Sequence, residues 1–444
     1  MSSFITKTKK TILILGDIGL LYISLYLTLM IRYGYLVEQN IWSRHLIPFS
    51  VVFLTWLVVF FINDFYDLKT SYNTAALSNS LIKIFIINGS IAVAIFYFFA
   101  PFIDSIKPQR VLIIDLLITI VLIFAWRKIF FKFIKSSNIA NKVLIIGQNK
   151  LSEELVEQIK RRPQLGYQVM TLENLPDDLN NFCLNNNIDI LVSTLDLKNE
   201  MVARKIFDCL SLEIDVYNIN SFYEQITNSI PVEYIDHSWF LENLTEHSKK
   251  LYEITKRLMD MVLAIIGLMV AIILMPIITV IIKLESPGPI IFKQTRTGKN
   301  GKTFTAMKLR SMIDDAEKNG AQWAQKNDKR ITKFGSFMRK TRIDEIPQLL
   351  NILRGEMSFV GPRPERPEFV EILEKEIPFY KERLLVKPGL AGWAQLYGPA
   401  YGGSETETLE KLKYDLYYIK NRNLFLDLSV ILKTIRVVLN QRGQ

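Results

Sequence analysis

Two adjacent carboxylates, Asp344 and Glu345, are the residues of this sequence best placed to do chemistry. They precede a short run of apolar residues at helical spacing that ends at Gly355, a pattern typical of a helix start, a helix and its C-terminal glycine. Acidic residues at a helix start often serve only as caps, because they accept from free N–H groups and offset the helix dipole. The neighbouring cations favour a second interpretation, in which the pair handles an anionic substrate.

Four cations flank the carboxylates along the chain. Arg339, Lys340 and Arg342 come before them, and Arg363 follows within the stiff Gly-Pro-Arg-Pro turn at 361–364. Carboxylates, guanidinium groups and a helix N-terminus together suit a metal-bound phosphate. The stretch from 341 to 364 is therefore predicted to hold a phosphate-handling active site.

The composition indicates a protein that lies partly in lipid. Apolar residues make up 49% of the 444 residues, and the mean hydropathy is positive. The net charge of +10 indicates basic cytoplasmic loops facing anionic lipid, and we expect no nucleic-acid partner. Only two cysteines, Cys183 and Cys209, and three histidines are present, which excludes a disulfide framework and argues against a zinc enzyme.

Residues 1–141 are predicted to form a four-helix transmembrane bundle. Four apolar runs, at about 11–31, 44–62, 81–102 and 111–126, are near the length that spans a bilayer. Basic clusters stand before the first run and after the fourth, so both ends of the bundle are expected in the cytoplasm. Asp17 and Asp115 lie inside apolar runs, and we expect them to face inward with a local partner; a functional polar site is the alternative.

Residues 142–245 are predicted to form a doubly wound, Rossmann-like α/β domain, because strand runs alternate with amphipathic helical patterns. The strand at 143–147 ends in Gly147, and a glycine directly after a strand is the first element of the dinucleotide-binding fingerprint. The two further glycines of that fingerprint are missing, since the next residues run Gln-Asn-Lys-Leu-Ser. A scaffolding or regulatory role is therefore favoured over nucleotide binding.

Residues 246–283 are predicted to be a basic segment followed by a re-entrant membrane hairpin. The apolar run at 261–282 is long enough to span a bilayer, but Pro276 interrupts it and basic residues lie at both of its ends. A spanning helix shows a basic excess on one side only, so a hairpin that dips into one leaflet is favoured over a fifth span. The residues assigned to this membrane hairpin are Lys256, Arg257, Asp260 and Pro276.

Residues 284–444 are predicted to be an α/β catalytic domain that is rich in charge. Strands are expected at 290–294 and 304–309, and a helix at 311–325. Two helices with apolar stripes, at about 405–420 and 427–440, close the chain. The whole chain is thus predicted to be a membrane protein of the α plus α/β class.

The motifs of the last part resemble those of one known family. They follow one another as Lys256-Arg257-x-x-Asp260, the apolar segment broken by Pro276, Ser286-Pro287-Gly288-Pro289, Gln294-x-Arg296-x-Gly298, Lys308-Leu309-Arg310-Ser311-Met312, Asp344-Glu345-x-Pro347-Gln348 and Gly361-Pro362-Arg363-Pro364. Residues 250–444 therefore resemble the bacterial sugar transferase family, the polyprenyl-phosphate hexose-1-phosphate transferases. The parts ahead of them are similar to the large form of these monotopic membrane enzymes.

The resemblance implies a reaction and a place for it. A UDP-sugar would give its sugar-1-phosphate to undecaprenyl phosphate and release UMP, as the first step of exopolysaccharide, capsule or O-antigen synthesis. The reaction would run at the cytoplasmic face of the bacterial inner membrane, with Mg²⁺ as cofactor and the lipid bilayer as partner.

The resemblance also implies roles for single residues. Asp344 matches the family's nucleophile, Glu345 its magnesium-binding carboxylate, and Arg339 a further catalytic cation. The residues that match substrate-binding positions are Arg363, Pro362, Pro364, Lys308, Arg310, Arg296 and Gln348. Met275 stands where the family often has a serine before the hairpin proline, which leaves the details of that helix break open.

Two other functions remain as alternatives. Membrane-bound nucleotide-sugar dehydratases have a similar front end, but they need an intact glycine fingerprint and a Tyr-x-x-x-Lys pair, which residues 142–245 lack. A scaffold without activity is the other alternative, and the retained Asp344, Glu345 and Arg363 argue against it. The sequence leaves the sugar and the oligomeric state open, a homodimer being one option.

Overall fold

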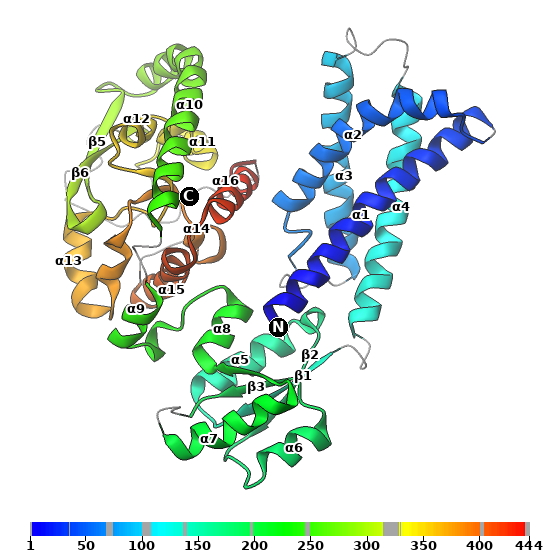
Figure 1. Cartoon of the computed structure of the whole chain (residues 1–444). Helices are drawn as coiled ribbons and strands as arrows, with labels where there is room; N and C mark the ends of the chain where they lie inside the picture. Colours follow the sequence, from blue (N-terminus) through cyan, green and yellow to red (C-terminus); the bar gives the residue numbers. More distant parts are fainter. Residues whose placement is uncertain are drawn as a thin grey trace. The chain divides into compact units, whose positions relative to one another are not determined.

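The computed structural model divides the chain into two compact units, Met1–Thr227 and Asn228–Gln444, each of which is described by itself. Figure 1 shows the elements of both units. The residues described are 2–34, 36–67, 74–99, 108–135, 140–195, 199–244, 249–313, 328, 330–399 and 404–439.

The first unit begins with four long helices. They are α1 (Ser2–Tyr33), α2 (Gln39–Ile62), α3 (Thr74–Phe99) and α4 (Pro108–Lys135). Within the described part of the chain, α1, α2 and α3 of this unit are long and apolar enough to cross a membrane. The helix α4 packs against α1 and α3 but carries Asp115, Arg127 and Lys128 along its length. The prediction of apolar helices is thus confirmed for three of the four expected runs.

Both carboxylates inside the bundle have local partners, as expected. Asp17 on α1 forms a buried ion pair with Arg127 on α4. Asp115 on α4 accepts a hydrogen bond from the Ser24 hydroxyl on α1, and that hydroxyl also contacts Thr119. Buried charges and hydroxyls in an apolar bundle need such partners, so these contacts fix α1 against α4.

The rest of the first unit is a parallel α/β layer. Its strands are β1 (Asn141–Ile146), β2 (Tyr167–Leu172), β3 (Ile190–Ser193) and β4 (Asp215–Asn218), in the order β2-β1-β3-β4. Val143 and Ile145 of β1 pack in a cluster with α5 (Lys150–Lys160) and α8 (Ile219–Thr227). The alternate residues Leu144 and Ile146 pack in a second cluster with α6 (Leu179–Asn186) and α7 (Glu200–Asp208). Helices therefore cover both faces of the sheet, which confirms the predicted α/β class.

The turn after β1 is closed by its own residues. Gly147 has a φ of +88°, and a Cβ added to it would lie 2.0 Å from the Thr194 hydroxyl. The Asn149 side chain accepts from the backbone N–H of Ser152, and the Ser152 hydroxyl accepts from the Asn149 N–H. These amides at the start of α5 are the ones that a dinucleotide fingerprint would offer to a phosphate. Here side chains of the chain itself occupy them.

The second unit carries the long helix α10 (Lys250–Glu285) and the remaining elements. Its described residues form two strand pairs, the antiparallel β5 (Ile291–Thr297) with β6 (Thr303–Leu309) and the parallel β7 (Ser358–Val360) with β8 (Gly389–Ala391). The other elements are η4 (Val232–Tyr234), α9 (His237–Asn243), η6 (Lys299–Gly301), α11 (Lys333–Thr341), η7 (Ile343–Glu345), α12 (Gln348–Arg354), α13 (Pro367–Glu376), η8 (Tyr380–Leu385), α14 (Trp393–Tyr397), α15 (Glu405–Asn421) and α16 (Leu424–Leu439).

The helix predicted at 311–325 falls mostly outside the described residues. Its described start is not helical, because Met312 forms a β-bridge with Ile331. The predicted strands and the two closing helices are confirmed as β5, β6, α15 and α16. Ile230 and Val232 pack in the core of the second unit, with Tyr380, Leu416 and Ile419.

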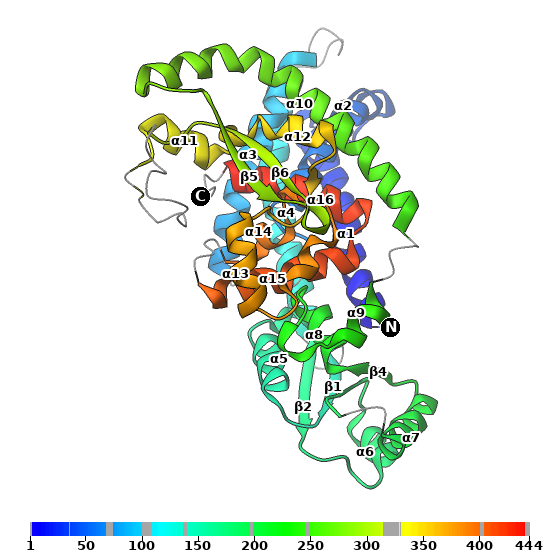
Figure 2. The same ribbon diagram turned by 90° about the vertical axis from the view of Figure 1, so that its left-hand side faces the viewer.

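The helix α10 does not break at Pro276, contrary to the expectation of two helical arms. It runs as one α-helix of 36 residues with Pro276 inside it, and Figure 2 shows it bent along its length. Proline lacks the N–H that the helix needs at that position, and a helix packed along one side can absorb this loss by bending.

Candidate active site

The two carboxylates lie on a short 3₁₀ turn between two helices. The helix α11 ends at Thr341, and Arg342 takes a left-handed conformation with a φ of 56° that turns the chain. Asp344 and Glu345 follow in η7, and α12 starts after Pro347 and ends before Gly355, which has a φ of 82°. The predicted helix and its terminal glycine are confirmed. The carboxylates precede that helix instead of forming its first turn, because Pro347 stands at its start.

Glu345 is a buried carboxylate held by three cations. Its Oε1 lies 2.8 Å from the Arg363 guanidinium and 3.1 Å from Lys308 Nζ, and its Oε2 lies 3.4 Å from Arg342. Only 4% of the residue is exposed. Burial by itself would raise the pKa of Glu345, but Arg363, Lys308 and Arg342 together hold it well below its usual value. Glu345 is therefore ionised at every pH at which the protein would work.

Asp344 is also buried, but it is not paired in this way. Among the described residues, none forms an ion pair or hydrogen bond with its carboxylate. Burial raises the pKa of Asp344, and the charge of Glu345 adds to this effect, while Lys308, Arg339 and Arg363 oppose it. The site thus contains one carboxylate fixed by cations and, next to it in the chain, a second buried carboxylate without such partners.

Arg339 sits on α11 beside this pair. Its Nε donates to the Ser311 hydroxyl at 2.8 Å, and its positive charge lowers the pKa of Asp344. Ser311 follows the strand β6 that carries Lys308, so one hairpin positions both cations. The structure therefore brings together Asp344, Glu345, Arg339, Lys308 and Arg363, which the sequence motifs had grouped.

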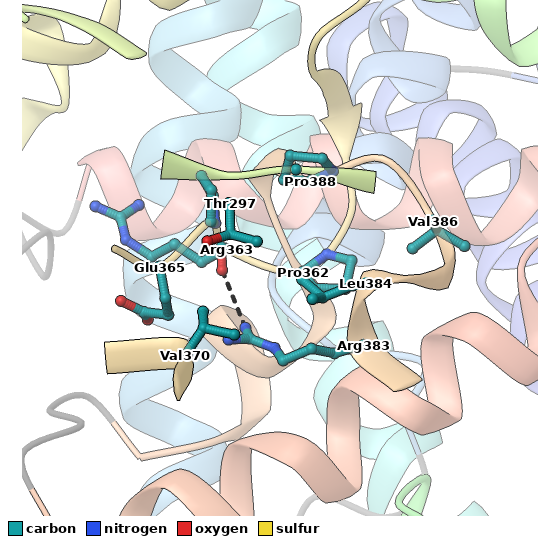
Figure 3. Close-up of a pocket in the computed structure, with 11 residues that line it drawn as sticks. Thr297, Pro362, Arg363, Glu365, Val370, Arg383, Leu384, Val386 and Pro388 are labelled. Atoms are coloured by element: carbon teal, nitrogen blue, oxygen red, sulfur yellow. Dashed lines mark hydrogen bonds between the residues drawn. The ribbon is translucent and has the colours of Figure 1, made fainter. Parts of the chain in front are cut away.

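Arg296 and the two prolines shape the loop around Arg363. Arg296 Nη1 donates to the Pro364 carbonyl at 3.1 Å and lies 3.5 Å from the Glu365 carboxylate. Figure 3 shows Arg363, flanked by Pro362 and close to Glu365, in the lining of a recess that Arg383, Leu384, Val386 and Pro388 also line. Arg296 thus supports the loop, and its role as a direct substrate ligand stays a prediction.

The other two predicted substrate residues, Arg310 and Gln348, are both buried. Arg310 donates to the carbonyls of Ser286 and Pro287 and so closes the turn that follows α10. Gln348 is buried, with 4% of its surface exposed, in the first turn of α12. Substrate binding by either residue stays a prediction.

Three of the four residues assigned to the membrane hairpin, Lys256, Arg257 and Asp260, contact other elements of the second unit, whereas Pro276 is exposed. Lys256 forms a buried ion pair with Asp427 at 2.8 Å. Asp260 accepts from the Ser358 hydroxyl and the Phe359 N–H on β7, and Arg257 donates to the carbonyls at the end of α12. Buried charges need partners of this kind, so these contacts fix the start of α10 to its unit.

A hydroxyl and a buried arginine of this site had not been identified from the sequence, and one flanking cation, Arg342, had been given no role of its own. Arg342 binds Glu345, and its spacing of three residues from that carboxylate was a usable signal. Ser311 orients Arg339, and Arg383 donates to the Arg363 carbonyl at 3.0 Å. The Ser311–Arg339 and Arg383–Arg363 contacts could not be predicted from local sequence spacing, because their partners are 28 and 20 residues apart.

The donor set limits how a magnesium ion could be held. Among the described residues, no group of three or more Asp, Glu, His or Cys side chains could hold a metal ion. Mg²⁺ is commonly bound by one or two carboxylates, with water and substrate phosphates as the other ligands. The hard oxygens of Asp344 and Glu345 fit that kind of site, although Glu345 shares its oxygens with three cations.

The raised pKa of Asp344 predicts an acid limb in the pH profile of any reaction in which its carboxylate attacks. The rate should fall as pH drops through that pKa, above the ordinary aspartate value of 3.8. Lys308→Met should move the limb to higher pH, because Lys308 is the strongest of the groups that lower this pKa. The measurement is kcat/KM against pH, with the exposed Lys381→Met as control. An acid limb that stays at the same pH in the Lys308→Met variant would contradict the assignment of this limb to Asp344.

Comparison with known proteins finds relatives of the part of the chain that carries this site. The sequence model described as "Bacterial sugar transferase" matches residues 251–441. A UDP-N-acetylgalactosamine-undecaprenyl-phosphate N-acetylgalactosaminephosphotransferase of Aeromonas hydrophila is 41% identical over 252 residues, 56% of this chain and 59% of that protein. A UDP-glucose:undecaprenyl-phosphate glucose-1-phosphate transferase of Xanthomonas campestris pv. campestris is 45% identical over 171 residues, 38% of this chain and 35% of that protein. The chain thus spans roughly a third to three fifths of the length of these two relatives.

A shorter relative is covered over about four fifths of its length. The exopolysaccharide production protein PSS of Rhizobium leguminosarum bv. phaseoli is 40% identical over 165 residues, which are 36% of this chain and 82% of that protein. All the site residues described above lie inside the matched range 251–441. On these matches and on the arrangement of its motifs, the chain belongs to the bacterial sugar transferase family.

Proposed function

We propose that this chain transfers a sugar-1-phosphate from a UDP-sugar to undecaprenyl phosphate and releases UMP. The observation that carries the proposal is the carboxylate pair, in which Glu345 is bound by three cations while Asp344 stays unpaired beside it. The named relatives act on undecaprenyl phosphate with glucose or N-acetylgalactosamine donors, which supports the same substrate classes here.

The chemistry follows from the two carboxylates. An Asp344 oxygen attacks the sugar-linked phosphorus, the bond from that phosphorus to the oxygen of UMP breaks, and UMP leaves with the electron pair. The undecaprenyl phosphate oxygen then attacks the same phosphorus and frees the Asp344 carboxylate. One phosphoanhydride is broken and one is made overall, so the reaction needs no other energy source. Carboxylates are competent phosphoryl acceptors in this kind of covalent catalysis.

The cations of the site can reduce the repulsion between the attacking carboxylate and the diphosphate of the donor. An anionic nucleophile and a diphosphate repel each other until positive charge neutralises the phosphate oxygens. Arg363, Lys308, Arg342 and Arg339 converge on the carboxylate pair and can supply that charge. A magnesium ion held by Glu345, with Asp344 beside it, would add further neutralisation of the transferred phosphoryl group.

The placement of α10 supports action at one membrane face. Along α10, apolar side chains at helical spacing are exposed, including Leu258, Val262, Ile265, Met269, Ile272, Ile273, Ile277 and Val280. Near its start Lys256 binds Asp427, and near its end Ile278 and Ile282 pack with Leu309 and Met338. A straight helix of 36 residues measures roughly 54 Å, so a span would separate these ends across the bilayer. Since both ends bind one unit, we propose that α10 inserts into one leaflet of the bacterial inner membrane.

The catalytic unit would then lie in the cytoplasm, where UDP-sugars are made. The relative from Rhizobium is named for exopolysaccharide production, and we propose an initiating step of exopolysaccharide, capsule or O-antigen synthesis for this chain. The α/β layer of the first unit is proposed to have a scaffolding or regulatory role, because its phosphate-type turn is capped by Asn149 and Ser152.

The test is release of UMP from a panel of UDP-sugars by the full chain in membranes supplied with undecaprenyl phosphate. We expect UMP release and a lipid-linked sugar diphosphate with at least one of UDP-glucose, UDP-galactose, UDP-N-acetylglucosamine and UDP-N-acetylgalactosamine. The matched control is the Asp344→Asn chain in the same membranes. Release of UDP in place of UMP would indicate an ordinary glycosyl transfer and overturn the proposal.

A further inference from the structure

The backbone carbonyls around Arg363 are all held by other groups. The Pro362 carbonyl accepts from the Gly389 N–H, the Pro364 carbonyl from Arg296, and the Glu365 carbonyl from the Thr297 N–H. The carbonyl of Arg363 itself accepts from Arg383 Nη2 at 3.0 Å. A loop in which each successive carbonyl has a partner has one well-defined conformation. Arg383 is the side chain that fixes its central residue.

The backbone at the start of this loop is also closely packed against the segment at 387–389, which leaves no space for a side chain at Gly361. A Cβ on Gly361 would lie 2.4 Å from the Lys387 carbonyl oxygen, and one on Gly389 would lie 2.1 Å from the Gly361 nitrogen. Pro362 and Pro364 restrict φ on either side of Arg363. The direction in which the Arg363 guanidinium leaves the loop, toward Glu345 at 2.8 Å, is therefore set by the bonds to these carbonyls.

Arg383 uses four of its five N–H donors on groups of the protein itself. Its Nε and Nη2 bind Asp415 Oδ2 at 3.1 and 2.8 Å, and its Nη1 donates to the Tyr380 hydroxyl at 2.7 Å. Arg383 is 7% exposed and Asp415 is 2% exposed. Figure 3 shows the Arg383 side chain extended below the loop, with its bond to the Arg363 carbonyl drawn as a dashed line. A buried arginine with this set of partners holds other residues in place.

We infer that Arg383, fixed by Asp415 and Tyr380, is the positioning residue that aims Arg363 at Glu345 and at the donor phosphates. The inference rests on the proposed function, in which Arg363 contacts the diphosphate. It predicts that Arg383 acts only through Arg363. Lysine cannot replace it, because one ammonium cannot keep the paired contacts to Asp415 and also reach Tyr380 and the Arg363 carbonyl.

The test is a double-mutant cycle on the full chain in membranes. Arg383→Lys and Asp415→Asn should each lower kcat/KM for the UDP-sugar by about 10-fold or more, the effect typical of losing a residue that orients a ligand group. In an Arg363→Ala background the same two changes should cost less than about 2-fold, because their target is already gone. Lys381→Met, an exposed neighbour on η8, is the matched control and should change nothing.

Two further measurements separate a loss of positioning from a loss of folding and from a failure of the proposed reaction. Thermal unfolding shows whether a variant is folded, since a merely structural role would lower the melting temperature without non-additive kinetics. The same cycle is run on the Kd for UDP, which needs no turnover and so stays valid even if the proposed reaction is wrong. Equal losses from Arg383→Lys in both backgrounds, or no loss in either, would overturn the inference.

Discussion

Asp344→Asn is expected to abolish transfer of the sugar phosphate while leaving the protein folded. The variant keeps the shape of the side chain but removes the attacking oxygen, and loss of a covalent nucleophile typically costs about 10⁴-fold or more in kcat. The stability should stay equal or rise. Burial raises the pKa of Asp344, so the folded protein disfavours its charged form, and the neutral amide removes that penalty at neutral pH.

The measurement pairs a turnover assay with thermal unfolding of the same membrane preparation. The control is Glu374→Gln, which removes an exposed carboxylate that pairs only with Lys381. Asp344→Asn should lose activity with an unchanged or higher melting temperature, and Glu374→Gln should match the wild type in both. An Asp344→Asn chain that retains a tenth of the activity would exclude the nucleophile role.

Glu345→Gln is expected to lower the rate by about 10²-fold, the scale of losing a key electrostatic group in an active site. The change leaves Lys308, Arg342 and Arg363 without the carboxylate that they share. Their guanidinium and ammonium groups would then repel one another and lose their common orientation. If Glu345 also holds magnesium, the Mg²⁺ concentration for half-maximal rate should rise in the variant.

The readout is a magnesium titration of the UMP-release rate, with the melting temperature as a check on folding. Glu356→Gln is a suitable comparison, because Glu356 is a carboxylate of the same unit that contacts Asn351. A Glu345→Gln chain with the wild-type rate and magnesium dependence would remove Glu345 from the mechanism. A slower rate with unchanged magnesium dependence would assign Glu345 to the cation cluster alone.

Much of the fold could be predicted because it depends on local pattern. The buried strand Val143–Ile146 is a continuous apolar run, and Gly355 has the left-handed conformation that ends a helix. The ordered motifs likewise grouped Lys308, Arg339 and Arg363 with the carboxylates, which the structure confirms.

What sequence could not show depends on contacts between distant residues. Arg383 and Asp415 look like ordinary charges of helical segments, and only the fold reveals that they meet under the Arg363 loop. Lys256 and Asp260 were assigned to a membrane hairpin from their place before an apolar run. Their burial against Asp427 and Ser358 could be seen only once α10 was packed on its unit.

The break expected at Pro276 was wrong for a related reason. Proline costs a free helix one hydrogen bond and strain, and an isolated segment would bend or part there. In this protein α10 is held before Pro276 by Lys256 and Asp260 and after it by Ile278 and Ile282. Contacts on both sides keep the helix continuous, and they are not visible in the sequence around the proline.

The covalent role of Asp344 is tested most directly by exchange of labelled UMP into the UDP-sugar without any lipid acceptor. If Asp344 takes the sugar phosphate, the first half of the reaction is reversible by itself, so the full chain should exchange label in the absence of undecaprenyl phosphate. The Asp344→Asn chain should show none. Complete turnover with lipid but no exchange without it would contradict the account, because the lipid phosphate would then attack the donor directly and Asp344 would be a ligand only.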